Sequence, residues 1–264
     1  MRVFYSKSVL DGVPSGCKDI DGISYVDAMF GFSNKTIKNE EISYKSRISF
    51  EDAVAIENVV VDEESSIDML LAEPKPTSYN LYLVQKDEDK KELSVYDGKF
   101  NIRGIKQYWL KDYIEEPDIK SKNMSFKINP LKEGTCFEGK IYFNNLYEDE
   151  LGLLLWSLKL DEGCYQNVGL AKPYGFGRVK VNDIDLYIED LDKKYGSFNF
   201  DYMTEEDADK YINYYKEFFS KEKLNGKNVN DEKPVKELIH IKSKIAKAKE
   251  ANNYRYMEIS IEYK

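Results

Sequence analysis

The sequence predicts an α+β fold in which helices cover one face of an antiparallel sheet. Stretches with alternating apolar residues, typical of strands, recur along the chain, and one leucine-rich stretch has the spacing of an amphipathic helix. Near the middle of the chain the order is strand, helix, glycine-rich loop and strand, which is half of a β-α-β-β-α-β arrangement. We therefore expect the other face of the sheet to be free to receive a ligand.

Size and composition limit the class of protein. The chain has 264 residues, of which 33% are charged and 42% hydrophobic, so it can bury a full core in one large domain or two small ones. It has no run of about 20 apolar residues that could span a membrane. Residues 1–7 lack the apolar core of a signal peptide. We therefore expect a cytoplasmic protein with no membrane partner.

The cysteines and the histidine restrict the chemistry. Cys17, Cys136 and Cys164 are far apart and form no CxxC pair, which predicts free thiols rather than disulfides or a zinc site. His240 is the only histidine, so a nucleophile–histidine pair is disfavoured. The sequence therefore assigns no catalytic residue, no metal and no cofactor. Whether the chain is an enzyme stays open, because Asp, Glu, Tyr or Lys could still carry acid–base chemistry.

The elements of the first half are predicted from periodicity and turn residues. Residues 9–21 and 33–43 are polar and predict loops, and between them residues 25–31 predict a short helix or turn that ends on glycine. Alternation over residues 45–58 predicts a strand, with an irregularity near residues 51–52.

The middle of the chain has the clearest patterns. Residues 79–84 and 137–143 predict strands, the latter with the cleaner alternation. A helix is predicted to start at Asn145, with Glu148 as its capping acid, and to stop at Gly163. Its leucines recur at helical spacing: Leu151, Leu154, Leu155 and Leu158. A strand is then predicted over residues 178–188.

The last third of the chain predicts two helices and a strand. Thr204 is the predicted cap of the first helix, with the acids of residues 205–207 in its first turn. Aromatic side chains at helical spacing favour core or subunit contacts over base stacking: Tyr211, Tyr214, Tyr215, Phe218 and Phe219. Residues 234–249 predict a lysine-rich helix that begins at proline, and residues 254–263 predict a final strand.

The most unusual segment is the run over residues 169–178, GLAKPYGFGR, which leads into the valine-rich residues 179–181. Its glycines allow positive φ and a close approach of the backbone to a ligand. Lys172 and Arg178 add cationic donors, and Tyr174 adds a flat stacking face. Exposed N–H groups, cations and aromatic rings together suit a phosphate backbone. The alternative is a glycine hairpin with incidental charges.

Charge is distributed unevenly along the chain. The net charge of −9 argues against a generally basic nucleic-acid-binding protein. Residues 99–111 and 169–181, however, contain lysine and arginine and no acid, whereas acids crowd into residues 62–64, 183–192 and 205–209. An acidic protein of this kind can present one basic groove.

Three further stretches accompany the glycine-rich run: residues 27–31 (DAMFG), 44–53 (YKSRISFEDA) and 102–109 (IRGIKQYW). With residues 169–178 they resemble CRISPR-associated RAMP proteins. The first is similar to an Asp-x-apolar-Phe-Gly element, the second to an Arg-apolar-x-Phe-x-Asp-Ala strand and the third to an Arg-Gly-x-Lys-x-Tyr-Trp element. The fourth is similar to the glycine-rich signature near the C-terminal end of the family. The match spans about residues 25–181, in the expected order.

The resemblance implies a ferredoxin-like (RRM-like) fold and RNA binding within a type III-like CRISPR effector of several subunits. CRISPR RNA (crRNA), target RNA and other effector subunits are the implied partners. Cations are expected to contact phosphates, and Tyr108, Trp109 or Tyr174 to stack on bases. The implied RNA-binding residues are Lys45, Arg47, Arg103, Lys106, Tyr108, Trp109, Gly169, Lys172, Tyr174, Gly175, Gly177 and Arg178.

The chain also departs from the family pattern. The first β-α unit of such proteins has no counterpart here, so we expect a fragment, a split gene product or a truncated variant, whose open sheet edge a partner chain completes. The aspartate that supports target-RNA cutting in some members belongs to the unmatched part. We therefore expect a RAMP core over residues 1–200 and a helical extension with a final strand over residues 201–264.

Three functions remain open from the sequence. The first is a non-catalytic crRNA-binding subunit, for which the matched stretches argue. The second is an endoribonuclease that processes CRISPR precursor RNA. It is disfavoured because many such enzymes use a histidine of the N-terminal half as general base, and this chain has none there. A mechanism that uses tyrosine and lysine instead stays open. The third is a structural protein whose glycine loop contacts another protein.

Overall fold

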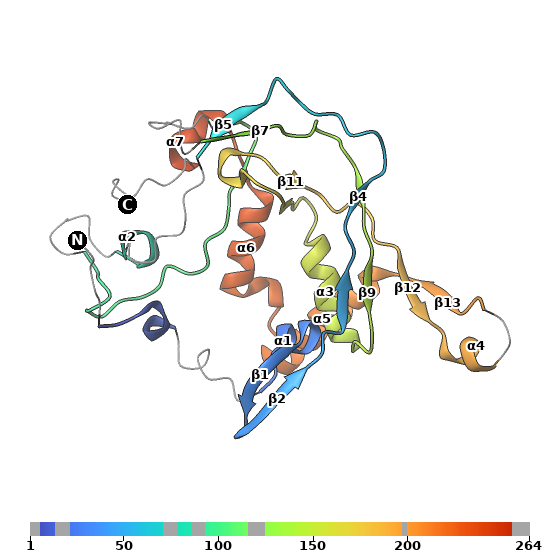
Figure 1. Cartoon of the computed structure of the whole chain (residues 1–264). Helices are drawn as coiled ribbons and strands as arrows, with labels where there is room; N and C mark the ends of the chain where they lie inside the picture. The colour runs from blue at the N-terminus through green and yellow to red at the C-terminus, as the bar shows by residue number, and fades with distance from the viewer. Residues whose placement is uncertain are drawn as a thin grey trace.

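The structure is a computed structural model that describes residues 6–13, 22–70, 79–85, 93–115, 125–196 and 200–254 (Figure 1). It is a mixed α+β protein, as the sequence predicts. Over these residues each sheet consists of two strands, and the pairs are antiparallel except for β14 with β6. None of the helices in the described ranges combines the length and apolar character needed to cross a bilayer.

The helices are short apart from α3, α5 and α6. They are α1 (Tyr25–Phe30), α2 (Tyr79–Tyr82), α3 (Glu148–Lys159), α4 (Leu191–Gly196), α5 (Ala208–Lys223), α6 (Lys233–Ser243) and α7 (Ala251–Tyr254). Single 3-10 turns are η1 (Val9–Gly12), η4 (Lys172–Tyr174), η5 (Val229–Asp231) and η6 (Ala248–Glu250).

The strands are two to six residues long. They are β1 (Phe32–Ile37), β2 (Glu40–Tyr44), β3 (Ile48–Phe50), β4 (Val54–Ala55), β5 (Ile67–Met69), β6 (Leu110–Lys111), β7 (Phe126–Ile128), β8 (Phe137–Glu138), β9 (Ile141–Phe143), β10 (Gln166–Asn167), β11 (Arg178–Val179), β12 (Leu186–Glu189), β13 (Met203–Glu206) and β14 (Ile245–Ala246).

The N-terminal part confirms the predicted helix and corrects a predicted loop. Helix α1 starts at Ser24, whose hydroxyl accepts a hydrogen bond from the Asp27 N–H group, and it ends at Gly31 with φ of +74°. The loop predicted over residues 33–43 is instead the β1–β2 hairpin. Lys38 and Asn39 both have positive φ, which gives the tight turn a hairpin requires.

The strands predicted over residues 45–58 and 137–143 are present, and they pair with each other. The irregularity expected in residues 45–58 is present, because β3 and β4 are separated by residues 51–53. Strand β3 pairs with β9 and β4 pairs with β8, so residues 137–143 form a strand that is broken at Gly139. A Cβ on Gly139 would lie 3.2 Å from the Ala53 backbone, which is the reason that glycine suits this crossing.

The main hydrophobic core lies between α3 and α5, which cross near the centre of Figure 1. The leucine stripe of α3 is confirmed as core, and so are Tyr211 and Tyr215 of the predicted aromatic stripe, whereas Tyr214 stays 43% exposed. The buried cluster comprises Leu151, Leu155, Trp156, Leu186, Ala208, Tyr211, Ile212, Tyr215 and Val229. The residues predicted as a C-terminal extension therefore share a core with the preceding part of the chain.

Two predicted helix starts are wrong. Asn145 has positive φ, and α3 begins after Tyr147, whose N–H donates to the Glu150 carboxylate at 2.8 Å. Thr204 lies in β13 opposite Ile188. Helix α5 begins only at Ala208, after residues 205–207, which were predicted to form its first turn. In the second case pairing with β12 overrides the helix-favouring acids of residues 205–207.

Other boundaries differ as well. Residues 79–82 form helix α2 rather than the predicted strand, and Leu83 makes only a bridge to Ile102. The strand predicted over residues 178–188 is divided into β11 and β12. Helix α3 ends at Lys159, before Gly163, and α6 ends at Ser243, before Lys249. Most of the strand predicted over residues 254–263 lies outside the described residues, and Tyr254 itself ends α7.

Candidate functional site

The glycine-rich run forms the tip of the β10–β11 hairpin, in which Asn167 pairs with Arg178. The single turn η4 is followed by Gly175 with φ of +104°. Gly177 has φ of +72°, and a Cβ there would lie 1.8 Å from the Val168 carbonyl oxygen. These two glycines are therefore needed by the backbone of the loop itself.

The loop uses several of its backbone N–H groups internally. The Val168 N–H donates to the Gly177 carbonyl at 2.8 Å, and the Tyr174 N–H donates to the Ala171 carbonyl at 2.9 Å. The sequence predicted a cradle of exposed amides for phosphate. At these positions the amides are already bonded, so a ligand here would meet chiefly side-chain charge.

Tyr174 belongs to the core and not to a stacking surface. Its side chain is 3% exposed and packs with Met69 and Ala171, and its hydroxyl donates to the Leu70 carbonyl at 2.6 Å. This burial corrects the expectation that Tyr174 stacks on bases. The tyrosine instead fastens the loop to the end of β5.

The second basic stretch of the sequence, residues 99–111, lies against this loop. Its last residue, Lys111, is buried and donates to the Pro173 carbonyl at 2.6 Å while pairing with Glu115. A Cβ on Gly175 would lie 2.2 Å from the Tyr113 carbonyl oxygen, so the backbones are in close contact. Two stretches that are about 60 residues apart in the sequence thus meet here.

The three aromatic residues predicted to stack differ in exposure. Tyr108 is 45% exposed, and the Lys172 ammonium lies 5.5 Å from its ring centroid. Trp109 is half-buried and makes edge contacts with His240 and Tyr254 at 6.1 and 5.0 Å between ring centroids. Since Tyr174 is buried, Tyr108 is the predicted aromatic residue with the most accessible ring.

Sequence reasoning missed one residue of this site, Lys242 of α6. Its side chain is buried, and its ammonium donates to the Asn167 side-chain oxygen at 2.8 Å. The Tyr165 N–H donates to the Lys242 carbonyl at 2.8 Å, which joins α6 to the start of β10. Burial, together with repulsion from Lys172, lowers the pKa of Lys242.

Lys172, Arg178 and Lys242 are here called the cationic cluster. The Arg178 guanidinium lies 5.5 Å from the Tyr165 ring centroid and donates weakly to the Lys111 carbonyl at 3.4 Å. The Lys172 ammonium donates to the Gly169 carbonyl. Among the residues that the structure describes, no carboxylate pairs with any of the three. A cluster of this kind can hold an anion.

A sequence signal for Lys242 does exist. Val235, Leu238 and Ile239 are partly buried, and Lys242 continues their spacing of i, i+3, i+4 and i+7. Lysine therefore occupies an apolar position of an amphipathic helix. A lysine at such a position is unusual because ammonium groups are rarely fully buried without a partner.

The remaining predicted residues lie in different surroundings. Arg47 donates to the Ala28 carbonyl at 2.8 Å and to the Asn145 carbonyl, and it pairs with the buried Glu150. It thereby ties α1 to the start of α3, which is a structural role. Lys45 is exposed.

Arg103 and Lys106 are exposed and lie on the segment that leads to Tyr108. The Lys106 ammonium lies 4.9 Å from the Tyr82 ring centroid. Although the residue as a whole is exposed, desolvation of its ammonium beside the Tyr82 ring, together with the charge of Arg103, lowers the pKa of Lys106. These two cations add positive charge to the segment that packs on the glycine loop.

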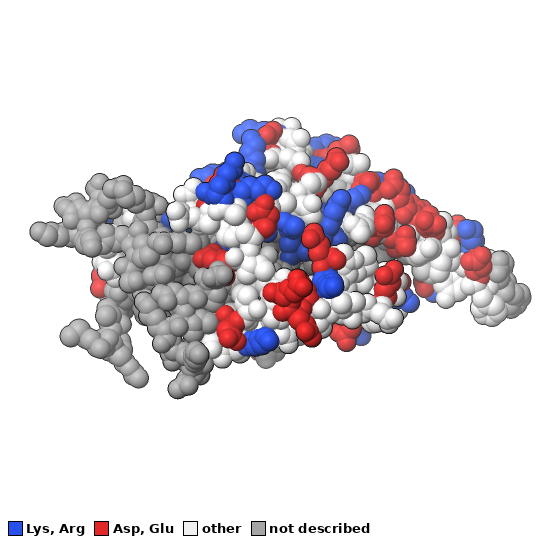
Figure 2. Space-filling view, turned by 90° about the horizontal axis from the view of Figure 1, so that it is seen from above, with Lys and Arg blue, Asp and Glu red and all other residues white. Residues whose placement is uncertain are grey.

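Charged side chains gather by sign on the surface. Figure 2 shows Lys and Arg grouped towards the upper left of the face seen from above, and Asp and Glu grouped towards the right and the lower middle. The uneven distribution of charge along the sequence is therefore also present in space.

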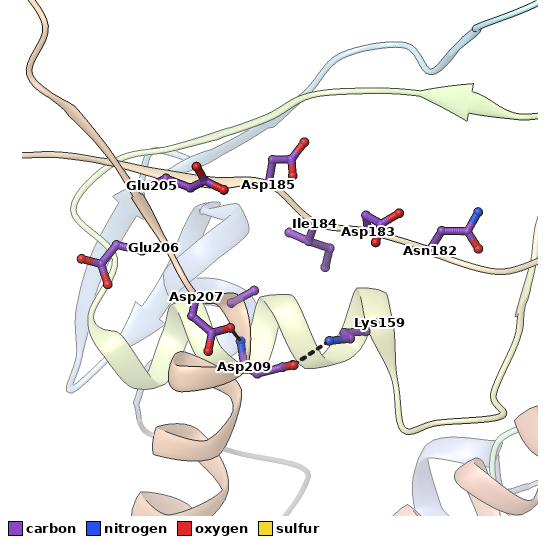
Figure 3. Close-up of a pocket in the computed structure, with 10 residues that line it drawn as sticks. Lys159, Asn182, Asp183, Ile184, Asp185, Glu205, Glu206, Asp207 and Asp209 are labelled. Atoms are coloured by element: carbon purple, nitrogen blue, oxygen red, sulfur yellow. Dashed lines mark hydrogen bonds and ion pairs between the residues drawn. The ribbon is translucent and has the colours of Figure 1, made fainter.

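A separate concave surface is acidic (Figure 3). It is lined by residues 182–185, by residues 205–209 and by Lys159, whose ammonium pairs with Asp209 at 2.7 Å. Across the described ranges, His, Cys, Asp and Glu side chains form no group of three or more that could hold a metal ion. This surface would repel RNA, and it provides no metal centre.

Comparison with known protein families and with curated proteins finds no match to this chain. Its function therefore has to be inferred from its own residues. Of the two charged surfaces, the cationic cluster has the more distinctive chemistry, because its cations have no carboxylate partner among the described residues and one of them, Lys172, lies beside the exposed Tyr108 ring.

Proposed function

We propose that this chain binds RNA through the cationic cluster and Tyr108, as a non-catalytic crRNA-binding subunit of a type III-like CRISPR effector in antiviral defence. The observation that carries the proposal is that Lys172, Arg178 and Lys242 gather at the β10–β11 hairpin with no paired carboxylate among the described residues, and that Lys172 lies over the exposed Tyr108 ring. The proposed location is the cytoplasm, and the proposed partners are crRNA, target RNA and other effector subunits.

The chemistry of this surface favours RNA among anionic ligands. Single-stranded RNA carries one negative charge per nucleotide and exposes its bases, so cations that neutralise phosphates beside an aromatic ring match both features. Tyr108 keeps an accessible ring, and Lys172 over that ring places positive charge within reach of a neighbouring phosphate. Arg103 and Lys106, on the same segment as Tyr108, extend the positive surface.

The finer fold belongs to the same proposal, and it is ferredoxin-like (RRM-like). The contact of an antiparallel strand pair with a helix, which such a fold requires, is present where Ile48 of β3 packs with Leu154 of α3 and Met29 of α1. Further strands beside the β3–β9 pair would come from a partner chain.

The test is a titration of fluorescent single-stranded RNA, followed by anisotropy, over a range of salt concentrations. We expect binding that weakens steeply with salt, and no RNA product on a denaturing gel. The double substitution K172Q/R178Q should weaken binding at least tenfold and reduce the salt slope by about 0.7 for each lost phosphate contact. Lys233→Gln is the matched control, because Lys233 is 87% exposed and lies on α6.

The alternatives give different results in the same experiment. Absence of RNA binding would overturn the proposal and favour a protein-interaction role. Cleavage at one position without metal would favour the precursor-processing endoribonuclease. Binding that K172Q/R178Q leaves unchanged would show that the RNA site lies elsewhere.

A further inference from the structure

We propose that the cationic cluster receives the terminal phosphate of an RNA strand, a phosphate monoester, and not an internal phosphodiester. This inference rests on the proposed function, which it makes specific. It concerns how one end of the RNA is held. It also assigns a direct contact with the ligand to Lys242, a residue that lies outside the sequence stretches associated with RNA binding.

The geometry of the β10–β11 hairpin brings the donors to one face. Asn167 and Arg178 are direct cross-strand partners, so their side chains lie on the same face. Tyr165, two residues before Asn167, is on that face as well, and the Arg178 guanidinium lies over its ring. Lys242 reaches this face from α6, with its ammonium 2.8 Å from the Asn167 side-chain oxygen.

The third cation, Lys172, comes from the loop at the end of the same hairpin. The Val168 N–H group donates to the Gly177 carbonyl at 2.8 Å, which closes this loop onto the hairpin, and repulsion from Lys172 adds to the burial that lowers the pKa of Lys242. In the parts of the chain that the structure describes, the Lys242 ammonium bonds to the Asn167 amide and forms no ion pair with a carboxylate. The cluster therefore concentrates positive charge that no carboxylate among the described residues neutralises.

Charge and burial favour a monoester over a diester. A terminal phosphate carries a charge of about −1.5 to −2 at pH 7 and three free oxygens, whereas an internal phosphodiester carries one charge. Three cations and the Asn167 amide can use those extra acceptors and that extra charge. Lys242 is only 7% exposed. The end of an RNA strand extends in one direction only, so it can approach this buried ammonium with less steric obstruction than an internal nucleotide.

The experiment compares RNA ends of one sequence against the full chain. A 12-nucleotide RNA is prepared with a 5′-phosphate, a 3′-phosphate or hydroxyls at both ends, with the fluorophore on an internal base. Inorganic phosphate alone is titrated in parallel by thermal denaturation. We expect one phosphorylated end to bind at least tenfold more tightly than the hydroxyl RNA, and we expect phosphate alone to raise the melting temperature.

Two variants assign the effect to the cluster. Lys242→Gln removes the buried cation, and Asn167→Asp places a carboxylate beside Lys242 without changing side-chain size. Both should abolish the advantage of the phosphorylated end, whereas Lys233→Gln should retain it. Asn167→Asp replaces the hydrogen bond from the Lys242 ammonium to an amide by a charge-assisted one to a carboxylate, so this variant is expected to fold about as stably as the wild type. A folding defect of Lys242→Gln therefore does not obscure the result.

The outcomes separate this inference from the proposed function. Equal affinity for the phosphorylated and hydroxyl RNAs would overturn the inference while leaving RNA binding intact. A preference that persists in both Lys242→Gln and Asn167→Asp would also overturn it. No binding of any RNA, combined with protection by phosphate that depends on Lys242, would overturn the RNA proposal and leave a site for a small phosphate ligand.

Discussion

Gly152 in α3 sets how closely α3 and α5 approach, and Gly152→Ala is the sharpest test of that packing. A Cβ at this position would lie 2.0 Å from the Tyr211 carbonyl oxygen and 2.8 Å from the Tyr215 Cβ. Neither atom can rotate away, since one belongs to the backbone and the other is the Cβ atom of a buried side chain. Alanine is therefore accommodated only if the two helices separate.

The size of the effect follows from two opposing terms. Helix propensity alone favours alanine over glycine by about 1 kcal/mol. Against this, the Cβ would lie roughly 1.4 Å closer than the 3.4 Å at which ordinary contact begins. Overpacking typically costs about 1–3 kcal/mol, and a gap of about 0.5–1 Å already forfeits a quarter to a half of each dispersion contact. Because the clash is with backbone, we expect a net loss of about 2 kcal/mol and a Tm lower by about 4–8 °C.

The assay is urea unfolding followed by tryptophan fluorescence, since Trp156 lies in this core. The matched control is Gly196→Ala at the end of α4, where a Cβ would meet no atom within 4 Å and stability should change by less than about 0.5 kcal/mol. A single shifted transition would also show that α5 unfolds together with α3. If Gly152→Ala is as stable as the wild type, or more stable, the close packing of α3 on α5 is refuted.

Three further changes test other parts of the fold. Arg47→Gln should lower the free energy of unfolding by about 3–5 kcal/mol, because it leaves Glu150 buried without its partner; an unchanged urea midpoint would contradict this. Gly177→Ala should weaken RNA binding by distorting the hairpin, while Gly196→Ala should not, as measured by the same anisotropy titration. A hydrogen bond from Lys35 holds the pKa of Asp27 below its ordinary value, so Asp27 stabilises the fold above about pH 4 and this contribution is lost as pH falls. Asp27→Asn should therefore reduce stability at pH 7 and not at pH 2, and equal effects at the two pH values would refute it.

Elements with strong periodicity were predictable from the sequence. The leucines of α3 and the aromatic residues of α5 recur at helical spacing because one face of each helix is buried, and that burial leaves its pattern in the sequence. Helix α1 was predictable because Gly31 adopts the positive φ that commonly ends a helix. These signals are local, so they need no knowledge of the tertiary structure.

Elements that depend on pairing between distant residues were not predictable in the same way. Strand β13 consists of residues whose acids favour the first turn of a helix, and only its pairing with β12 makes it a strand. The β1–β2 hairpin is polar on most of its surface, with Ile37 as its buried residue, so alternation is weak. Helix α2 is four residues long, and apolar runs of that length do not distinguish a helix from a strand.

The candidate site likewise combines features that were predictable from local sequence with contacts that depend on the tertiary structure. The glycine loop and the stretch before Lys111 were identifiable because their composition is unusual, but their contact follows only from the fold. Tyr174 was assigned to RNA by its residue type and Arg47 by the family resemblance, and the structure gives both a role in packing. Lys242 was missed because it lies 75 residues from Asn167 in the sequence and its helix contains many other lysines.

A comparison of two buried lysines at this site argues that the cationic cluster has a function beyond folding. Lys111 and Lys242 are 5% and 7% exposed, and both are attached to the same hairpin. Lys111 has a carboxylate partner in Glu115, which is how a protein ordinarily neutralises a buried ammonium. Lys242 has an amide instead, although aspartate has nearly the same shape as Asn167 and would stabilise the ammonium more strongly. An amide at that position keeps the positive charge available, and a charge that is kept available at a cost in stability is best explained by an anionic ligand.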